Sequence, residues 1–262
     1  MLNTWIESTE RDPSEYNTFT TWDLSEASSP SDEIKSELAR RITDARTDRA
    51  FVREAATFLG WDGVRDLMDS VIPTVGTLRK GRFGEVLAQW VLEELHGYAV
   101  PVNKLHFALT QNQSLPGTDL LAVKVNTEGT EIVEVCLLES KLRTSADTGC
   151  GVEAHDQLVA DARQRIPAIY RFTAERLREQ GDPLFGAFME YLRERRQSGG
   201  PSDTFRIFLT FDVEPWSETT LVNLHELPPD LAQLAAHKLL VTGLAQLIED
   251  VYGSVGMTSG ED

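Results

Sequence analysis

A strand-like stretch near the middle of the chain ends in a carboxylate and an amine two residues apart. The run EIVEVCLLESKL covers residues 131–142, and its apolar part, which extends through Leu138, is followed by Glu139, Ser140 and Lys141. Side chains alternate along a strand, so Glu139 and Lys141 project from one face and Ser140 from the other. A carboxylate and an ammonium group are thereby placed side by side.

Asp119 offers a second carboxylate at the start of the preceding predicted strand, in the segment LPGTDLLAV. The stretch between Asp119 and Glu139 is long enough for two neighbouring antiparallel strands joined by a turn at 127–130. Carboxylate oxygens are the ligands that hard cations such as Mg²⁺ prefer. Asp119 and Glu139 can therefore converge on one cation.

The periodicity of the apolar residues predicts the elements that position these side chains. We expect a helix from Lys80 to His96, stopped by Gly97, and then strands at 99–107, 118–126 and 131–142, the last of them central in a sheet. The later elements expected are an amphipathic helix over 152–178 kinked at Pro167, a helix over 183–196, a strand over 205–213 and a helix over 229–252. The fold class predicted is α/β, with a mixed central sheet flanked by helices.

The N-terminal part of the chain is expected to form a separate layer. Its first thirty residues are polar and broken by prolines, which predicts an extended or loosely ordered arm. Helices are expected from Ser31 to about Ala56 and from Trp61 to Val71. The domain division predicted is an arm and helical layer at 1–75, a main domain at 76–252 and a flexible tail at 253–262.

Composition narrows the class of protein. No apolar run in the 262 residues approaches a membrane helix, and the N-terminus lacks the features of a signal peptide, so a soluble cytoplasmic protein without membrane contact is expected. The two cysteines, Cys136 and Cys150, are expected to be free thiols. The sequence has no GxxxxGK[ST] loop, GxSxG elbow or HExxH motif, which disfavours ATP hydrolysis and the corresponding hydrolase chemistries.

The net charge of −17 opposes binding of nucleic acid over most of the surface, but the charge is unevenly distributed. Residues 76–196 carry 15 basic and 17 acidic side chains, whereas the flanks are strongly acidic. An anionic substrate would thus approach the central segment. The basic residues near the candidate site, which are candidates for phosphate contacts, are Arg79, Lys80, Arg82, Arg143, Arg163 and Arg165.

The aspartate at a strand start followed by E-x-K on the next strand resembles the PD-(D/E)xK nuclease superfamily. The resemblance covers residues 80–213 and includes Gly117-Thr118-Asp119, Glu139-Ser140-Lys141 and Glu85 of GRFGE on the preceding helix. One departure is that the proline, Pro116, comes three positions before the aspartate instead of directly before it. Within the superfamily, these segments look most like the nuclease subunits of Hachiman anti-phage defence systems.

The resemblance implies a restriction-endonuclease-like core (helix, three strands, helix, strand) with extra N- and C-terminal helices, and a metal-dependent DNA endonuclease or nickase. Asp119, Glu139 and the backbone carbonyl of Ser140 would hold Mg²⁺ or Mn²⁺, and Glu85 a second cation or the hydration shell of the first. Lys141 would orient the attacking water or stabilise charge in the transition state. A helicase or other DNA-binding protein, docked on the acidic flanks at 31–75 and 229–252, would deliver the DNA.

Other interpretations of the same residues remain open. Asp119 can be a turn residue, and Glu85 a charge on a solvated helix face, favoured in the first turn. Glu139 with Lys141 can be a solubilising pair on an edge strand. The rival function is a catalytically inactive, nuclease-like binding or scaffold subunit that docks a DNA-binding partner. A DNA-mimicking inhibitor is disfavoured because the centre of the chain is nearly neutral.

Overall fold

The structure is a computed structural model that describes residues 1–11, 19–47, 49–69, 72–108, 110–113, 117–197, 200, 202–228 and 230–255. Pro116 and most of the predicted tail lie outside the described residues. No helix within the described ranges is long and apolar enough to cross a membrane. Cys136 and Cys150 are both free and buried, as predicted.

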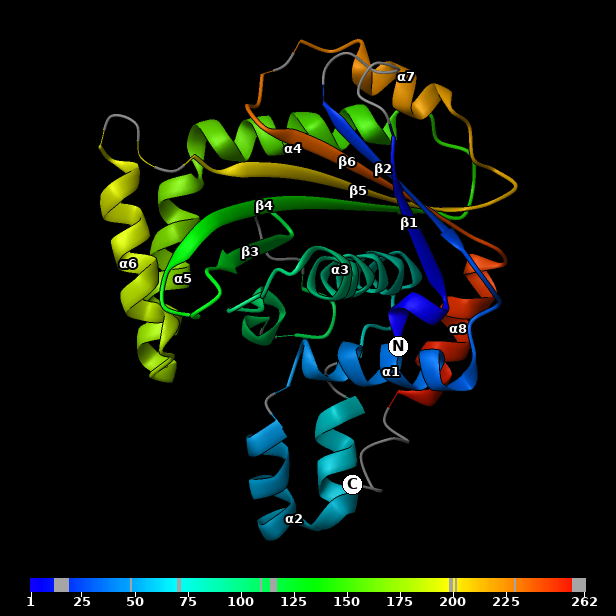
Figure 1. Cartoon of the computed structure of the whole chain (residues 1–262). Coiled ribbons are helices and arrows are strands. Elements are labelled where there is room, and N and C mark those ends of the chain that lie inside the picture. The colour runs from blue at the N-terminus through cyan, green and yellow to red at the C-terminus, as the bar shows by residue number, and fades with distance from the viewer. Residues whose placement is uncertain are drawn as a thin grey trace.

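A mixed six-stranded sheet forms the centre of the described structure (Figure 1). Its order is β1-β2-β6-β5-β4-β3; β2, β6, β5 and β4 run parallel, and the two edge strands are antiparallel to their neighbours. The strands are β1 (Ile6–Glu10), β2 (Thr20–Glu26), β3 (Leu120–Val125), β4 (Ile132–Arg143), β5 (Thr204–Asp212) and β6 (Leu234–Val241).

Helices cover both faces of this sheet. Figure 1 shows α3, α1 and α8 on one side, α4 and α7 on the other, and α5 with α6 at the end nearest β3. The bounds are α1 (Asp32–Asp44), α2 (Arg49–Asp69), α3 (Gly76–His96), α4 (Cys150–Gln164), α5 (Ile166–Gln180), α6 (Leu184–Arg195), α7 (Thr219–His225) and α8 (Leu244–Ser254). The predicted α/β class, with a mixed sheet flanked by helices, is confirmed.

Two layers of buried apolar side chains hold the sheet between these helices. Leu38, Trp90 and Phe208 belong to the layer that α1, α3 and α8 cover. Leu158 and Phe211 belong to the layer on the opposite face, beneath α4 and α7. Apolar burial on both faces explains why β4 and β5 are nearly continuous apolar runs, as expected for central strands.

Several predicted elements are confirmed with small shifts. Ser31 caps α1, because its Oγ accepts a hydrogen bond from the backbone N–H of Ile34 at 3.3 Å. Gly97 ends α3 in the left-handed conformation, with φ of 69°. The kink expected at Pro167 is a break between α4 and α5. The predicted strands at 118–126, 131–142 and 205–213 correspond to β3, β4 and β5.

The expectation of a loosely ordered arm is wrong for the described part of residues 1–30. β1 and β2 form one edge of the sheet, and β2 pairs in parallel with β6, more than two hundred residues away. Trp5 is buried in the core. Most residues of these short strands are polar, so their partners, and not their own composition, decide their structure.

The predicted strand at 99–107 is also wrong. Ala99 makes an isolated bridge to Val123, and Lys104–Phe107 forms a 3₁₀ helix, η3. Pro101 has no backbone N–H to donate to a ladder, and the Asn103 side chain instead caps η3 by accepting from the N–H of Leu105 at 3.1 Å. Two strands, β3 and β4, therefore lie between α3 and α4 in the described chain, where three were expected.

The predicted helix at 229–252 is wrong in its first half, where β6 precedes α8. The β6 sequence LAAHKLLV is buried on both faces, so it lacks the alternation that marks a strand. Gly243, with φ of 67°, makes the turn into α8. The helix expected from Ser31 to Ala56 ends at Asp44, and α2 begins at Arg49 and is interrupted at Gly60, where φ is 71°.

Candidate active site

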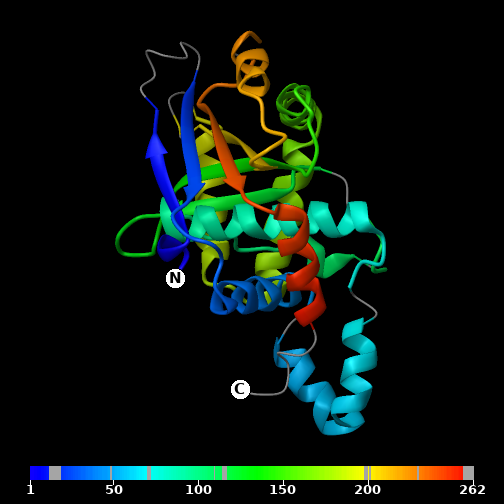
Figure 2. The same ribbon diagram turned by 90° about the vertical axis from the view of Figure 1, so that its right-hand side faces the viewer.

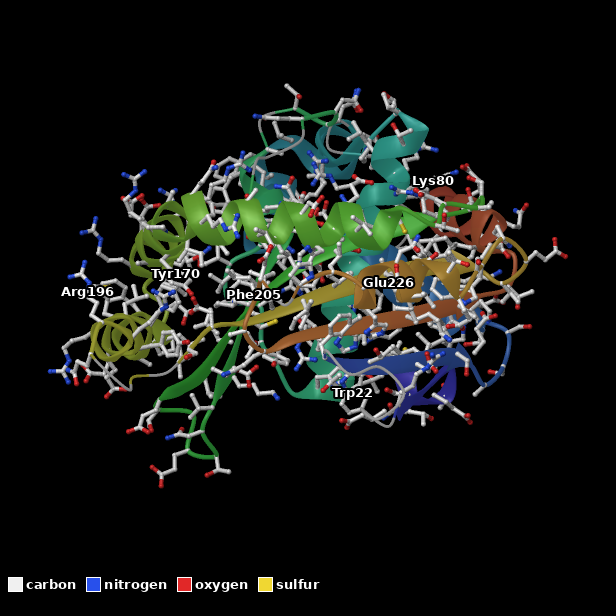
Figure 3. All side chains as sticks on the ribbon, turned by 90° about the horizontal axis from the view of Figure 1, so that it is seen from above. Trp22, Lys80, Tyr170, Arg196, Phe205 and Glu226 are labelled. Atoms are coloured by element: carbon white, nitrogen blue, oxygen red, sulfur yellow. The ribbon has the colours of Figure 1, made fainter. Side chains whose placement is uncertain are left out.

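A cavity of about 510 Å³ lies among the N-terminal half of α3, the start of β3 and the end of β4. The side chains that line it carry charges of both signs. One of these side chains, Lys80, is labelled in Figure 3. The charged residues that line it are Lys80, Arg82, Glu85, Asp119, Glu139, Lys141 and Arg143. Every predicted site residue, Ser140 included, lies on this one cavity.

Asp119 is fixed at the entrance to β3 by hydrogen bonds to both carboxylate oxygens. Its Oδ2 accepts from the backbone N–H of Ser140 at 2.9 Å, and its Oδ1 lies 3.4 Å from Lys104 Nζ. The pairing of Leu120 with Leu138 in the antiparallel ladder brings Asp119 next to Glu139 across the strands. Asp119 is therefore more than a turn residue, because its side chain also binds the end of β4.

Lys104 is a site residue that the sequence analysis missed. Its ammonium group donates to the carbonyl oxygens of Thr118 at 2.9 Å and Gly117 at 3.2 Å, in addition to Asp119. This lysine therefore holds the segment before β3 against η3 and places a positive charge beside Asp119. Residue 104 was expected in a strand, so nothing in the sequence signalled this role.

Glu139 and Lys141 project side by side from β4, as predicted. Lys141 Nζ lies 3.2 Å from Glu139 Oε1 and 3.0 Å from Oε1 of Glu153 on α4. The Glu139 residue is 5% exposed, and β4 lies between β3 and β5 in the sheet. The interpretation of this pair as a solubilising pair on an edge strand is wrong.

Glu85 reaches the cavity from α3, opposite the end of β4. An added Cβ at the neighbouring Gly84 would lie 3.2 Å from both Leu142 Cβ and Ser140 Oγ, so the glycine allows α3 to approach β4 closely. Arg82 Nη1 lies 3.5 Å from Glu85 Oε2. The interpretation of Glu85 as a charge on a solvated helix face is wrong, because its side chain is 13% exposed and lines the cavity.

Burial raises the pKa of both glutamates. Loss of hydration and then the negative charge of Asp119 raise the pKa of Glu139 to about 8 and that of Glu85 to about 7. Burial opposes the charge on Lys141, but Glu139 and Glu153 outweigh it and raise the pKa of this lysine. Ionisation of both glutamates beside Asp119 is thus unfavourable, and a proton or a cation bound between these carboxylates would relieve their repulsion.

Two carboxylate oxygens in the cavity, Oε2 of Glu85 and Oε2 of Glu139, are buried and receive no hydrogen bond from the described part of the chain. Within the described ranges, no three His, Cys, Asp or Glu side chains form a ready-made metal cage. Mg²⁺ keeps several waters and commonly uses only one or two carboxylates, so this donor set fits it. Glu139 and Asp119, with the Ser140 backbone and water, are the residues that would hold such an ion.

The predicted phosphate-contacting arginines and lysine divide into two groups. Lys80, Arg82 and Arg143 line the cavity, whereas Arg79 lies 3.7 Å from Glu249 and is absent from the lining. Arg163 and Arg165 form ion pairs with Asp230 and Asp161 away from the cavity.

The raised pKa values predict how metal binding depends on pH. Glu85 and Glu139 bind protons more tightly in the folded chain than in the unfolded chain. Their protonated side chains therefore add to the free energy of unfolding, in full below about pH 4.5, and this contribution is lost as the pH rises through about 7 and 8. A cation that binds the ionised carboxylates competes with these protons. Mg²⁺ should therefore raise the melting temperature more at about pH 8.5 than at about pH 6.

Thermal unfolding with Mg²⁺ and with EDTA at both pH values measures this effect. Glu139→Gln should lose most of the difference, whereas Glu131→Gln, in the exposed turn between β3 and β4, should retain it. Equal stabilisation of the unmodified chain at both pH values would contradict the assignment of these carboxylates as ligands.

Comparison with known proteins gives two findings. A model of the HamA family matches residues 1–235. The "Hachiman protein HamA" of Bacillus cereus is 32% identical over 116 residues, which cover 44% of this chain and 40% of that protein. The aligned part thus spans less than half the length of this curated relative.

Proposed function

This chain belongs to the HamA family, and from that premise we propose that it is a metal-dependent DNA endonuclease or nickase, the effector subunit of a Hachiman complex. Membership of the family supports a role in anti-phage defence. The observation that carries the proposal is the cavity in which Glu85, Asp119, Glu139 and Lys141 meet, with two buried carboxylate oxygens free of hydrogen bonds.

Each charged residue of this set has a distinct proposed role in phosphodiester hydrolysis. Asp119 and Glu139, with the Ser140 carbonyl, would hold Mg²⁺ or Mn²⁺, and Glu85 a second cation or the hydration shell. When bound, the cation would offset the phosphate charge and lower the pKa of the attacking water. Lys141, held by Glu139 and Glu153, orients that water or stabilises the negative charge that develops on the phosphate.

Lys80 is suited to bind a phosphate beside the reacting one. Its Nζ donates to Thr144 Oγ1 at 2.7 Å. The other cations lining the cavity have carboxylate partners, Glu85 for Arg82, Glu139 and Glu153 for Lys141, and Asp147 and Glu153 for Arg143. Among the described residues, Lys80 has no carboxylate within ion-pair distance, so its charge is available to DNA.

Lys80→Met should therefore raise KM for DNA about fivefold to tenfold, with kcat changed less than about twofold, because the contact is made equally in the ground and transition states. The difference in KM should shrink as salt rises. Steady-state kinetics at two salt concentrations test this, with Lys35→Met on α1 as the matched control. A fall in kcat with unchanged KM would assign Lys80 a role in the chemical step instead.

A partner protein, proposed here to be a helicase or other DNA-binding subunit, would dock on the N-terminal helices. Figure 2 shows α2 standing away from the body of the molecule. Phe51, Phe58 and Leu59 on α2 are 54%, 80% and 55% exposed, which is unusual for large apolar side chains. The acidic segments expected to dock the partner also supply core residues, including Leu38 and Leu244, so only their outer faces are available.

Phe51→Ser with Phe58→Ser should abolish co-purification with the proposed helicase partner while leaving the melting temperature nearly unchanged. The matched control is Val133→Ser on β4, where an apolar side chain is exposed to a similar degree. Size-exclusion chromatography after co-expression provides the measurement. Retention of the complex by the α2 variant would exclude α2 as the docking element without affecting the nuclease proposal.

An inactive scaffold subunit is the second candidate, and one observation favours it. Both oxygens of Asp119 already have donors, Ser140 N–H and Lys104, so the protein partly satisfies its own charges. A scaffold should bind its partner normally yet show no DNA cleavage with Mg²⁺ or Mn²⁺ in the presence of that partner.

A further inference from the structure

A second cavity, of about 690 Å³, lies between α5 and α6, and we name it the arginine groove. Among the residues that the structure describes, five arginines line it but only one carboxylate, that of Glu175, in a chain whose net charge is −17. The arginines are Arg171, Arg178, Arg193, Arg195 and Arg196. Figure 3 labels Arg196 and Lys80 at opposite ends of the view, so the groove is separate from the candidate active site.

Two of these arginines have close carboxylate partners within the fold. Arg195 binds Asp203, which also accepts hydrogen bonds from Tyr170 and Tyr191, and this buried cluster joins α5, α6 and the start of β5. Arg193 has a partner in the exposed Glu190. The remaining arginines of the groove require a different explanation.

Arg171 Nε is 3.9 Å from Glu175, and both side chains are exposed, so this pair is weak. Within the described part of the chain, Arg178 and Arg196 have no carboxylate at ion-pair distance. Positions near the last turns of α5 and α6 favour a cation, because the C-terminal end of a helix dipole is negative. That effect accounts for single cations at helix ends, but not for their grouping around one groove.

The spacing of the arginines suits a chain of phosphates. Arg171 and Arg178 lie two turns apart on one face of α5, which corresponds to about 10 Å along the helix. Single-strand sites place cations along the backbone of the bound strand. Two arginines about 10 Å apart on one helix face can therefore contact different phosphates of the same strand.

Apolar side chains line the groove together with the arginines. Phe185, Met189 and Leu192 from α6 line it, and Met189 is 44% exposed. Duplex DNA presents phosphates and would leave this surface uncovered, whereas a single strand also presents the faces of its bases. Single-strand sites combine cations that follow the backbone with side chains on which bases stack.

We propose that the arginine groove binds single-stranded DNA, with phosphates on Arg171, Arg178 and Arg196 and bases on Phe185 and Met189. The identification of DNA as the ligand rests on the proposed function. The groove is a binding site only, separate from the cavity that holds Glu139.

Binding of a fluorescent 12-nucleotide oligo-dT, measured by anisotropy in EDTA, tests the proposal without requiring cleavage. Arg178→Glu with Arg196→Glu should weaken binding at least about tenfold, because two attractive contacts become repulsive. The matched control, Arg53→Glu with Arg163→Glu, makes the same charge change at exposed arginines outside the groove and should weaken binding less than about twofold. Circular dichroism checks folding, and Arg178→Gln with Arg196→Gln serves if the reversal variant does not fold.

Phe185→Ala with Met189→Ala should weaken oligo-dT binding by about threefold to tenfold and leave duplex binding unchanged. Equal losses from the groove and control pairs, absence of oligo-dT binding by the unmodified chain at low salt, or equal displacement by poly-glutamate would overturn the proposal. Poly-glutamate displacement would indicate an acidic peptide site. These experiments measure binding and not cleavage. The binding result therefore remains interpretable if the chain is not a nuclease, and the nuclease assignment remains valid if the groove does not bind oligo-dT.

Discussion

Glu139→Gln and Lys141→Met should each lower the rate of DNA cleavage by at least about a thousandfold. Glutamine keeps the size of Glu139 but removes the negative charge that would hold a cation. Methionine keeps the length of Lys141 but removes the positive charge that lies 3.2 Å from Glu139. Single-turnover cleavage of a labelled oligonucleotide measures both losses.

Melting temperatures distinguish a loss of catalysis from a loss of folding in these variants. The Glu139 carboxylate is buried and its pKa is raised to about 8, so removal of its charge should leave the melting temperature unchanged or higher in EDTA. The controls are Glu131→Gln and Lys124→Met, at the far end of the β3–β4 hairpin from the cavity. Cleavage by Glu139→Gln within about tenfold of the unmodified rate would remove this carboxylate from the mechanism.

Removal of divalent metal should reduce cleavage at least about a thousandfold, and Mg²⁺ or Mn²⁺ should restore it. Ca²⁺ is larger and coordinates more loosely, so it should occupy the site and support DNA binding without efficient cleavage. Rates measured across a titration of each metal test this order. Equal rates with Ca²⁺ and Mg²⁺ would show that the geometry of the ion is unimportant here.

Much of the candidate site could be predicted because its residues lie on strongly patterned elements. β4 is apolar and buried on both faces from Val135 to Leu138, so the position where polarity begins again, at Glu139, marks the end of the buried run. Strand alternation then requires Glu139 and Lys141 to share a face, and the antiparallel pairing with β3 brings Asp119 beside them. These relations are local in sequence or follow from one hairpin.

The missed features depend on contacts between distant segments. Lys104 interacts with Asp119 only because Pro101 and Asn103 favour η3 over a strand, and its donors then reach the carbonyls before β3. β6 looks like a helix in sequence, and its strand structure comes from pairing with β5 and β2. The arginine groove arises from two helices, each of which alone appears to carry ordinary surface charges.

Digestion of supercoiled plasmid by the unmodified chain and by Glu139→Gln, purified in parallel, tests the central claim most directly. With Mg²⁺ the unmodified chain, supplied with its partner if the isolated chain is weak, should convert the plasmid to nicked or linear forms. Glu139→Gln should leave the plasmid supercoiled, and EDTA should stop the unmodified chain. Equal cutting by the two proteins, or cutting by the unmodified chain in excess EDTA, would contradict the claim that this cavity is a metal-dependent nuclease site.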